Sequence, residues 1–287
     1  MNLKGLRALA PYEWPDDADT TILKTLINKQ ASKNDRLAAA RLAGEIVVMN
    51  NEMAETLLSI VQSSSESEEM RGTAAMALGA VLEQADVEML EDGKFEDPEA
   101  VPISETTFRN LVEGLRKLVS DESLPKEVRR RVLEASVRAQ LDWHPNAVRT
   151  SYASKDKDWK LTAVFCMEYV RGFQDLILEA LESSDFNIHY HAIRAAGNWE
   201  FDAAWPHIVK LVADCKTPKP LRLAAIEAVA SIRPQEAGAI LVDLDSRNDE
   251  EIAEAADEAM MTAAAATGEL DEDDEEGEDE EAGDWMN

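Results

Sequence analysis

The stretch Leu221-Arg222-Leu223-Ala224-Ala225-Ile226-Glu227-Ala228-Val229-Ala230 sets a pattern that recurs along the chain. A basic residue is followed three positions later by a small one, as in Met70-Arg71-Gly72-Thr73-Ala74. The position of the small residue falls at residues 39, 74, 132, 163, 192, 225 and 256, in steps of 35, 58, 31, 29, 33 and 31. Steps of about 30 to 35 residues are typical of stacked helical repeats, and the long step fits one repeat plus an insertion.

The spacing of apolar residues predicts seven consecutive helix pairs, separated by turn-forming residues such as the serine run 63–65. We expect the pairs at 18–31 and 34–48, 51–62 and 67–84, 104–119 and 126–141, 144–154 and 158–170, 173–182 and 185–197, 203–214 and 218–232, and 235–245 and 249–265. The predicted organisation is an irregular lead-in at 1–15, a repeat domain at 16–265 with an acidic insertion at 85–103, and a disordered acidic tail at 266–287.

Residues at equivalent positions of the second helices form two kinds of column along the array, and these predict how the helices pack. One is a double column of small residues, such as Ala74 with Ala77 and Ala225 with Ala228, which lets neighbouring helices approach closely. The other is a basic column, predicted to form a structural ladder that bonds a carboxylate or carbonyl of the next pair. Its members are Arg36, Arg71, Arg129, Lys160, His189 and Arg222.

The charge of the chain is strongly negative and concentrated at one end. The formal net charge is −29, and 18 acidic residues with no basic ones follow Arg247. The first 247 residues therefore hold 58 − 18 = 40 acids against 29 bases, a balance of −11. Nucleic-acid binding depends on a basic surface, so we expect a protein partner and no nucleic acid.

The remaining composition predicts a cytoplasmic protein. The two cysteines, Cys166 and Cys215, provide neither a disulfide framework nor metal-ligand spacing. The first residues lack the apolar run of a secretory signal, and no stretch approaches the roughly 20 apolar residues that cross a bilayer. We therefore expect no membrane association. The sequence leaves the oligomeric state open.

The second-helix segments 70–79 and 221–230, together with the run from Ile188 to Val212, resemble short bacterial-type HEAT repeats, which are also found in phycobilin lyases. The resemblance covers most of residues 16–265 and is weaker in the third and seventh repeats. It implies an all-α superhelix, an armadillo-type α solenoid, in which the second helices line the concave side.

The family that the chain resembles includes enzymes, so the sequence was searched for catalytic patterns. Deoxyhypusine hydroxylase, also built of HEAT units, holds two irons with repeated His-Glu pairs. None of the four histidines here, His144, His189, His191 and His207, is followed by glutamate. His189 and His191 lie two residues apart and diverge on a helix. We therefore expect no catalytic residue, no cofactor, no metal site and no enzymatic activity.

The predicted function is a protein-interaction scaffold or adaptor that binds its partner on the concave face. Outward positions of the second helices place aromatic and basic residues in the middle of the array, and interfaces favour these types. The candidate partner-binding residues are Arg131, Arg138, Phe165, Tyr169, Tyr190 and Arg194. Two alternatives stay open: a phycobilin-lyase-like or other small-molecule-modifying HEAT enzyme, and an acidic chaperone of basic proteins.

Overall fold

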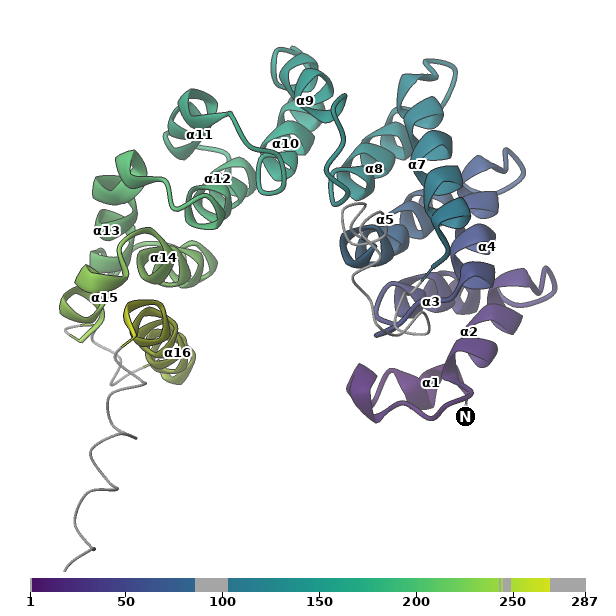
Figure 1. Cartoon of the computed structure of the whole chain (residues 1–287), viewed down its shortest axis with the longest axis horizontal. Coiled ribbons are helices and arrows are strands. Elements are labelled where there is room, and N and C mark those ends of the chain that lie inside the picture. Colours follow the sequence, from purple (N-terminus) through teal and green to yellow (C-terminus); the bar gives the residue numbers. More distant parts are fainter. Residues whose placement is uncertain (1, 86–102, 243, 245–248, 269–287) are drawn as a thin grey trace, which may run out of the picture. The chain divides into compact units, whose positions relative to one another are not determined.

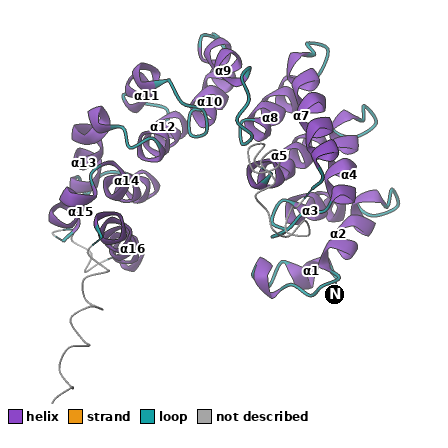
Figure 2. Ribbon diagram, viewed as in Figure 1, coloured by secondary structure: helices purple, strands orange, loops and turns teal. Residues whose placement is uncertain are grey.

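A computed structural model of the chain describes residues 2–85, 103–242, 244 and 249–268. Within these ranges every regular element is helical, with fifteen α-helices and two short 3₁₀ helices (Figures 1 and 2). The acidic insertion and the acidic tail predicted from the sequence lie outside the described residues, apart from residues 85, 103 and 266–268 at their edges.

Seven helix pairs follow a short N-terminal lead-in, as the sequence predicts. The lead-in contains α1 (Leu3–Leu6) and a 3₁₀ helix (Pro11–Glu13). The pairs are α2 (Ala18–Ile27) with α3 (Lys33–Ala43), α4 (Asn51–Gln62) with α5 (Glu68–Gln84), α7 (Glu105–Ser120) with α8 (Lys126–Ser136), α9 (His144–Tyr152) with α10 (Lys157–Cys166), α11 (Gln174–Leu181) with α12 (Phe186–Asn198), α13 (Trp205–Ala213) with α14 (Lys219–Ile232), and α15 (Pro234–Leu241) with α16 (Glu250–Thr267).

Short polar side chains start many of these helices. The side chains of Ser32, Asn50, Ser67 and Ser104 each accept a hydrogen bond from the backbone N–H three residues further on. Such N-caps satisfy donors that the first helical turn leaves unpaired. The caps explain why helix starts are predicted more accurately than helix ends in this chain.

The chain forms two compact units, residues 1–154 and 155–287, and the boundary falls between α9 and α10, so these two helices are a pair in sequence order but belong to different units. In the first unit the second helices α3, α5 and α8 pack side by side in sequence order. In the second unit α10, α12, α14 and α16 do the same, and α11, α13 and α15 each pack on their partner helix (Figure 1). Each unit therefore has the architecture of an α-α solenoid.

The small residues of the second helices form the contacts between neighbouring pairs. Ala74, Ala192 and Ala225 are fully buried, and the second column is buried from Ala77 to Ala259. At Gly197 an added Cβ would lie 3.2 Å from the Cα of Ala228, so this pair of helices has no room for a larger residue. The predicted role of the small columns is confirmed by this packing.

The basic column forms a ladder, but its main acceptor differs from the predicted one. The Nε atoms of four arginines each donate to the carbonyl ten residues earlier, at 2.8–3.0 Å. The pairs are Arg36 to Leu26, Arg71 to Val61, Arg129 to Val119 and Arg222 to Val212. These carbonyls end the first helix of the same pair, where they lack a helical partner. The expected contact to a carboxylate of the next pair is made by Arg36, which also binds Glu66, and by Lys160, which binds Glu179 at 3.0 Å. The carbonyl acceptors belong to the same pair and were not predicted.

Candidate partner-binding surfaces

The second helices of the first unit form an open groove of about 580 Å³. Met76 and Gly72 of α5 lie in it, with Arg41 of α3 on one side and Arg131 of α8 on the other. The remaining lining residues are Glu68, Glu69, Thr73 and Glu127. The groove thus combines the apolar side chain of Met76 with charged residues from three successive second helices.

Arg131, one of the predicted partner-binding residues, is held in place beside this groove. Its Nε lies 2.8 Å from Glu127 and its Nη1 2.9 Å from Glu134, a buried carboxylate. Burial opposes the charge of Arg131, but Glu134 and Glu127 outweigh it and raise the pKa of the guanidinium. Arg131 therefore presents a fixed side chain rather than a mobile one.

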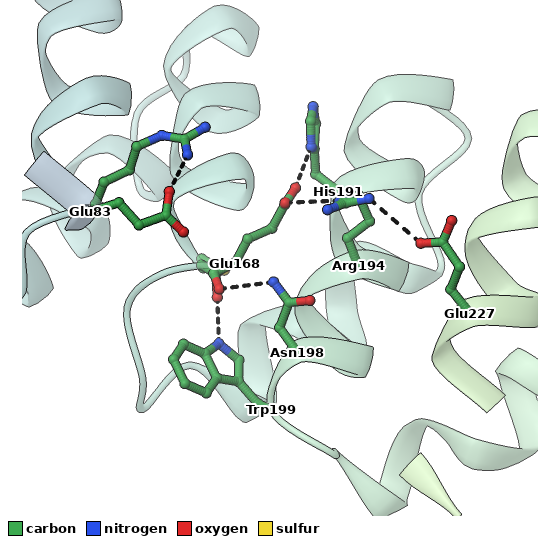
Figure 3. Close-up of polar contacts among 9 residues, drawn as sticks. Glu83, Glu168, His191, Arg194, Asn198, Trp199 and Glu227 are labelled. Atoms are coloured by element: carbon green, nitrogen blue, oxygen red, sulfur yellow. Dashed lines mark hydrogen bonds and ion pairs between the residues drawn. The ribbon is translucent and has the colours of Figure 1, made fainter. Parts of the chain in front are cut away.

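Arg138, the second predicted residue of this unit, lies seven residues after Arg131 and two residues beyond the end of α8. Its Nη1 lies 2.6 Å from the carboxylate of Glu83, which is labelled in Figure 3. An added Cβ at Gly79 would lie 2.6 Å from Arg138 Cδ, and one at Gly72 would lie 3.2 Å from Arg131 Cγ. The two glycines leave space on α5 that is filled by Arg131 of α8 and by Arg138, two residues beyond the end of α8.

The other four predicted residues lie in the second unit and are joined by ring contacts and ion pairs. The ring centroids of Phe165 and Tyr169 are 5.5 Å apart, and the His191 ring lies 5.3 Å from both Phe165 and Tyr190. Arg194, one turn beyond Tyr190 on α12, completes this aromatic cluster. All five side chains are partly exposed, as a binding surface requires.

A buried carboxylate, Glu168, organises the aromatic cluster, and sequence reasoning missed it. It accepts from His191 Nδ1 at 2.5 Å and from Arg194 Nε at 3.1 Å (Figure 3). Glu227 adds a looser contact of 3.7 Å to Arg194. Burial opposes the charge of Arg194, but Glu168 and Tyr190 outweigh it and raise its pKa. A glutamate among many in an acidic chain gives no sequence signal of such a role.

The end of α12 ties this network to the chain that follows α10. The side-chain amide of Asn198 donates to the Glu168 carbonyl at 3.2 Å, and the indole N–H of Trp199 donates to the Met167 carbonyl at 2.6 Å (Figure 3). The guanidinium of Arg171 stacks 4.7 Å above the Trp199 ring. Beside them, a smaller cavity of about 310 Å³ is lined by Arg171, Gly172, Phe173, Gln174, Ile177, Asn198, Trp199, Glu200 and Phe201.

The histidines form different contacts from the pair considered in the sequence. His189 and His191 diverge as predicted, but His189 meets His207, with 2.9 Å between the two Nε2 atoms. Eighteen residues separate them, and no local spacing could have revealed the contact. In the described part of the chain, no three or more His, Cys, Asp and Glu side chains converge as ligands of one metal ion. No helix in that part is both long enough and apolar enough to cross a membrane.

Comparison with known proteins identifies the repeat. Residues 174–261 match the family model described as HEAT repeats, which confirms over this region the resemblance predicted from the sequence. A search of curated proteins finds no match.

Two solved structures resemble the chain over most of its length. Human deoxyhypusine hydroxylase in complex with glycerol has 16% identity and a TM-score of 0.39, over 92% of this chain and 88% of that one. The Escherichia coli protein YibA has 15% identity and a TM-score of 0.47, over 89% and 85% of the two chains.

The comparisons correct one expectation from the sequence. The chain was predicted not to be an enzyme, and that prediction is contradicted because human deoxyhypusine hydroxylase, one of these similar structures, is an enzyme.

Proposed function

We propose that this chain is a scaffold that binds a protein partner on the face formed by its second helices. The proposal includes the expectations that the partner is a protein rather than a nucleic acid and that binding takes place in the cytoplasm. Solenoid repeats place successive second helices side by side and so build extended binding surfaces. The groove of the first unit and the aromatic cluster of the second both lie on such helices.

The groove between α3, α5 and α8 is the observation that carries the proposal. Its lining includes the side chain of Met76, and methionine adapts its shape to different apolar partners. Arg41 and Arg131 border it, and arginine is enriched where protein interfaces contribute most to affinity. An open groove with these residues fits an extended or helical segment of another protein better than an enclosed small-molecule site.

The aromatic cluster supports the same proposal in the second unit. Phe165, Tyr169 and Tyr190 offer aromatic surface, while Glu168 holds Arg194 and His191 in fixed orientations. Preorganised side chains lose little conformational entropy on binding. A buried ion network stabilises a fold little compared with apolar packing, so binding gives a physical reason for its presence.

The test is affinity capture from the native lysate, followed by titration of the identified partner. In the first unit, the double variant Arg41→Ala with Thr73→Arg removes one side of the groove and places a large side chain in it from a partly exposed position. In the second unit, Tyr190→Ala removes one ring and leaves both donors to Glu168 in place. We expect each variant to weaken partner binding by about 10-fold or more, the effect of losing an interface anchor.

The matched control is Lys117→Ala, which removes an exposed residue of the first helix α7 that pairs only with Glu113 in its own helix. The free energy of unfolding of each variant, measured in urea, should equal that of the parent to within about 0.5 kcal/mol. Unchanged affinity in both groove and cluster variants would contradict the proposal. Capture only of basic proteins, lost in moderate salt from parent and variants alike, would favour an acidic chaperone instead.

A further inference from the structure

The geometry points to a transition-metal site between His189 of α12 and His207 of α13, independent of the proposed partner-binding function. The two Nε2 atoms face each other at 2.9 Å, and the ring centroids lie 5.1 Å apart at an interplanar angle of 66°. We infer that the pair binds a divalent ion with nitrogen preference, of the Zn²⁺, Ni²⁺ or Cu²⁺ class.

The hydrogen-bond pattern fixes which nitrogens carry protons. His207 Nδ1 lies 3.3 Å from the carboxylate of Glu182, so this nitrogen is the donor in the neutral ring. His207 Nε2 is then an acceptor, and His189 Nε2 must donate to it. Two lone pairs at this distance repel each other, so a proton or another cation has to lie between the two nitrogens. A metal ion in this place would use both Nε2 atoms, and the proton of His189 would move by way of solvent from Nε2 to Nδ1, so that the ring stays neutral.

The distances are close to those of a metal complex. Zinc–imidazole bonds are about 2.0–2.1 Å, so two nitrogens in tetrahedral positions lie about 3.3 Å apart. The pair needs to open by only a few tenths of an ångström, which rotation of the two side chains supplies. Glu182 would remain on His207 Nδ1, the carboxylate–histidine–metal arrangement that fixes ring orientation at many metal sites.

The fold does not require a histidine at this position. Residue 189 belongs to the basic column in which Arg36, Arg71, Arg129 and Arg222 each bond a carbonyl ten residues earlier. An arginine could therefore serve the structural role here as well. The chain instead carries a histidine in this repeat and a second histidine facing it from the next first helix.

The pair supplies two protein ligands, since no third His, Cys, Asp or Glu converges with it in the described residues. A four-coordinate ion would keep two positions for water or for a ligand from outside the chain. Imidazole nitrogen favours Zn²⁺, Ni²⁺ and Cu²⁺, while Mg²⁺ and Ca²⁺ prefer oxygen ligands. The many carboxylates of this chain suit Mg²⁺ and Ca²⁺. An excess of Mg²⁺ therefore distinguishes Zn²⁺ bound by the histidines from Zn²⁺ bound by carboxylates.

The experiment is calorimetric titration of the full-length, EDTA-treated protein with Zn²⁺ in the presence of excess Mg²⁺, which occupies carboxylate sites. We expect one Zn²⁺ per chain, with two imidazoles in its shell by X-ray absorption. His189→Arg restores the common ladder residue, should fold like the parent, and should lose this Zn²⁺. His207→Gln should lose it too, and Glu182→Gln should weaken it by about 10-fold.

His191→Gln is the matched control, because His191 binds Glu168 rather than another histidine. It should bind Zn²⁺ as the parent does. Equal binding by the parent and a folded His189→Arg variant would overturn the inference. So would the same loss of binding in His191→Gln and His207→Gln, or a Zn²⁺ signal that excess Mg²⁺ abolishes.

Discussion

At the scale of single residues, the cap after α12 carries a conformational cost. Glu200 has φ of 49°, the one positive φ among the described non-glycine residues. Its N–H bonds the Gly197 carbonyl at 3.0 Å, and the N–H of Phe201 bonds the Ala196 carbonyl at 2.9 Å. This is the Schellman pattern, whose left-handed position usually holds glycine. Side chains other than glycine are strained in this region.

We predict that Glu200→Gly stabilises the second unit by up to about 1 kcal/mol, because glycine adopts a positive φ without strain. Urea unfolding followed by circular dichroism measures the change. Ala153→Gly is the control, since Ala153 caps α9 with φ of −72° and gains nothing from glycine. An unchanged or lower midpoint for Glu200→Gly would show that the side chain compensates for the strain.

The ladder arginines give a second prediction at this scale. Arg222 Nε donates to the Val212 carbonyl at 3.0 Å, at the end of α13. Arg222→Met keeps much of the apolar stem but leaves this partly buried carbonyl without its donor, so we expect a loss of about 1–3 kcal/mol. Lys210→Met, at an exposed position of α13, should change stability by less than about 0.5 kcal/mol. Equal losses of stability in the two variants would contradict a structural role for the arginine ladder.

At the scale of elements, two helical glycines should respond to alanine in opposite directions. An added Cβ at Gly79 of α5 would lie 2.6 Å from Arg138 Cδ, whereas one at Gly238 of α15 would meet no atom within 4 Å. We expect Gly238→Ala to stabilise by about 0.5–1 kcal/mol through helix propensity. Gly79→Ala should destabilise, because Arg138 must leave the space beside Gly79 and its contact with Glu83. Thermal unfolding of both variants checks the opposite signs.

The junction of α8 and α9 gives a prediction for pH. His144 is buried, with Nε2 3.2 Å from Ser136 Oγ, and burial lowers its pKa from 6.5 to about 4 despite the nearby Asp142. Because the folded pKa is the lower one, the neutral ring stabilises the first unit fully above pH 6.5. This contribution falls as the pH drops from 6.5 towards 4, by about 3 kcal/mol in total.

We expect His144→Gln to be less stable than the parent at neutral pH and to approach it as the pH falls, since glutamine does not titrate. Urea midpoints at several pH values from 7.5 to 4.5 measure the difference, and the other titrating groups cancel between the two proteins. A difference that stays constant with pH would contradict the burial of a neutral His144.

At the scale of the whole molecule, the sequence predicts the order of helices well and their lateral contacts poorly. Local spacing and capping residues such as Ser67 and Ser104 act within a few residues, and the seven pairs follow from them. Contacts across pairs depend on the angles between helices. Glu168 with His191, and His189 with His207, are therefore found only in three dimensions. The predicted residues fall into two units, and none of the sequence patterns marks the boundary between them.

The division into two units leads to the last prediction. Each unit has its own row of second helices and its own buried alanine columns, and the boundary at Ser154 and Lys155 lies in the short link between α9 and α10. Repeat proteins are stabilised by contacts between neighbouring repeats, so a unit that keeps its own contacts should fold alone. We expect fragments 1–154 and 155–287, expressed separately, each to give a helical circular dichroism spectrum and a cooperative urea transition.

The sum of the two fragment spectra should equal the spectrum of the full chain. Fragments cut inside a unit, at 1–124 and 125–287, are the control, because this cut separates α7 from α8, which pack as a pair. They should lose helix and aggregate, since the cut exposes apolar faces of both helices to water. Unfolded fragments from the 154/155 cut, alongside a folded full chain, would mean that the repeats stabilise one another across the boundary as one cooperative array.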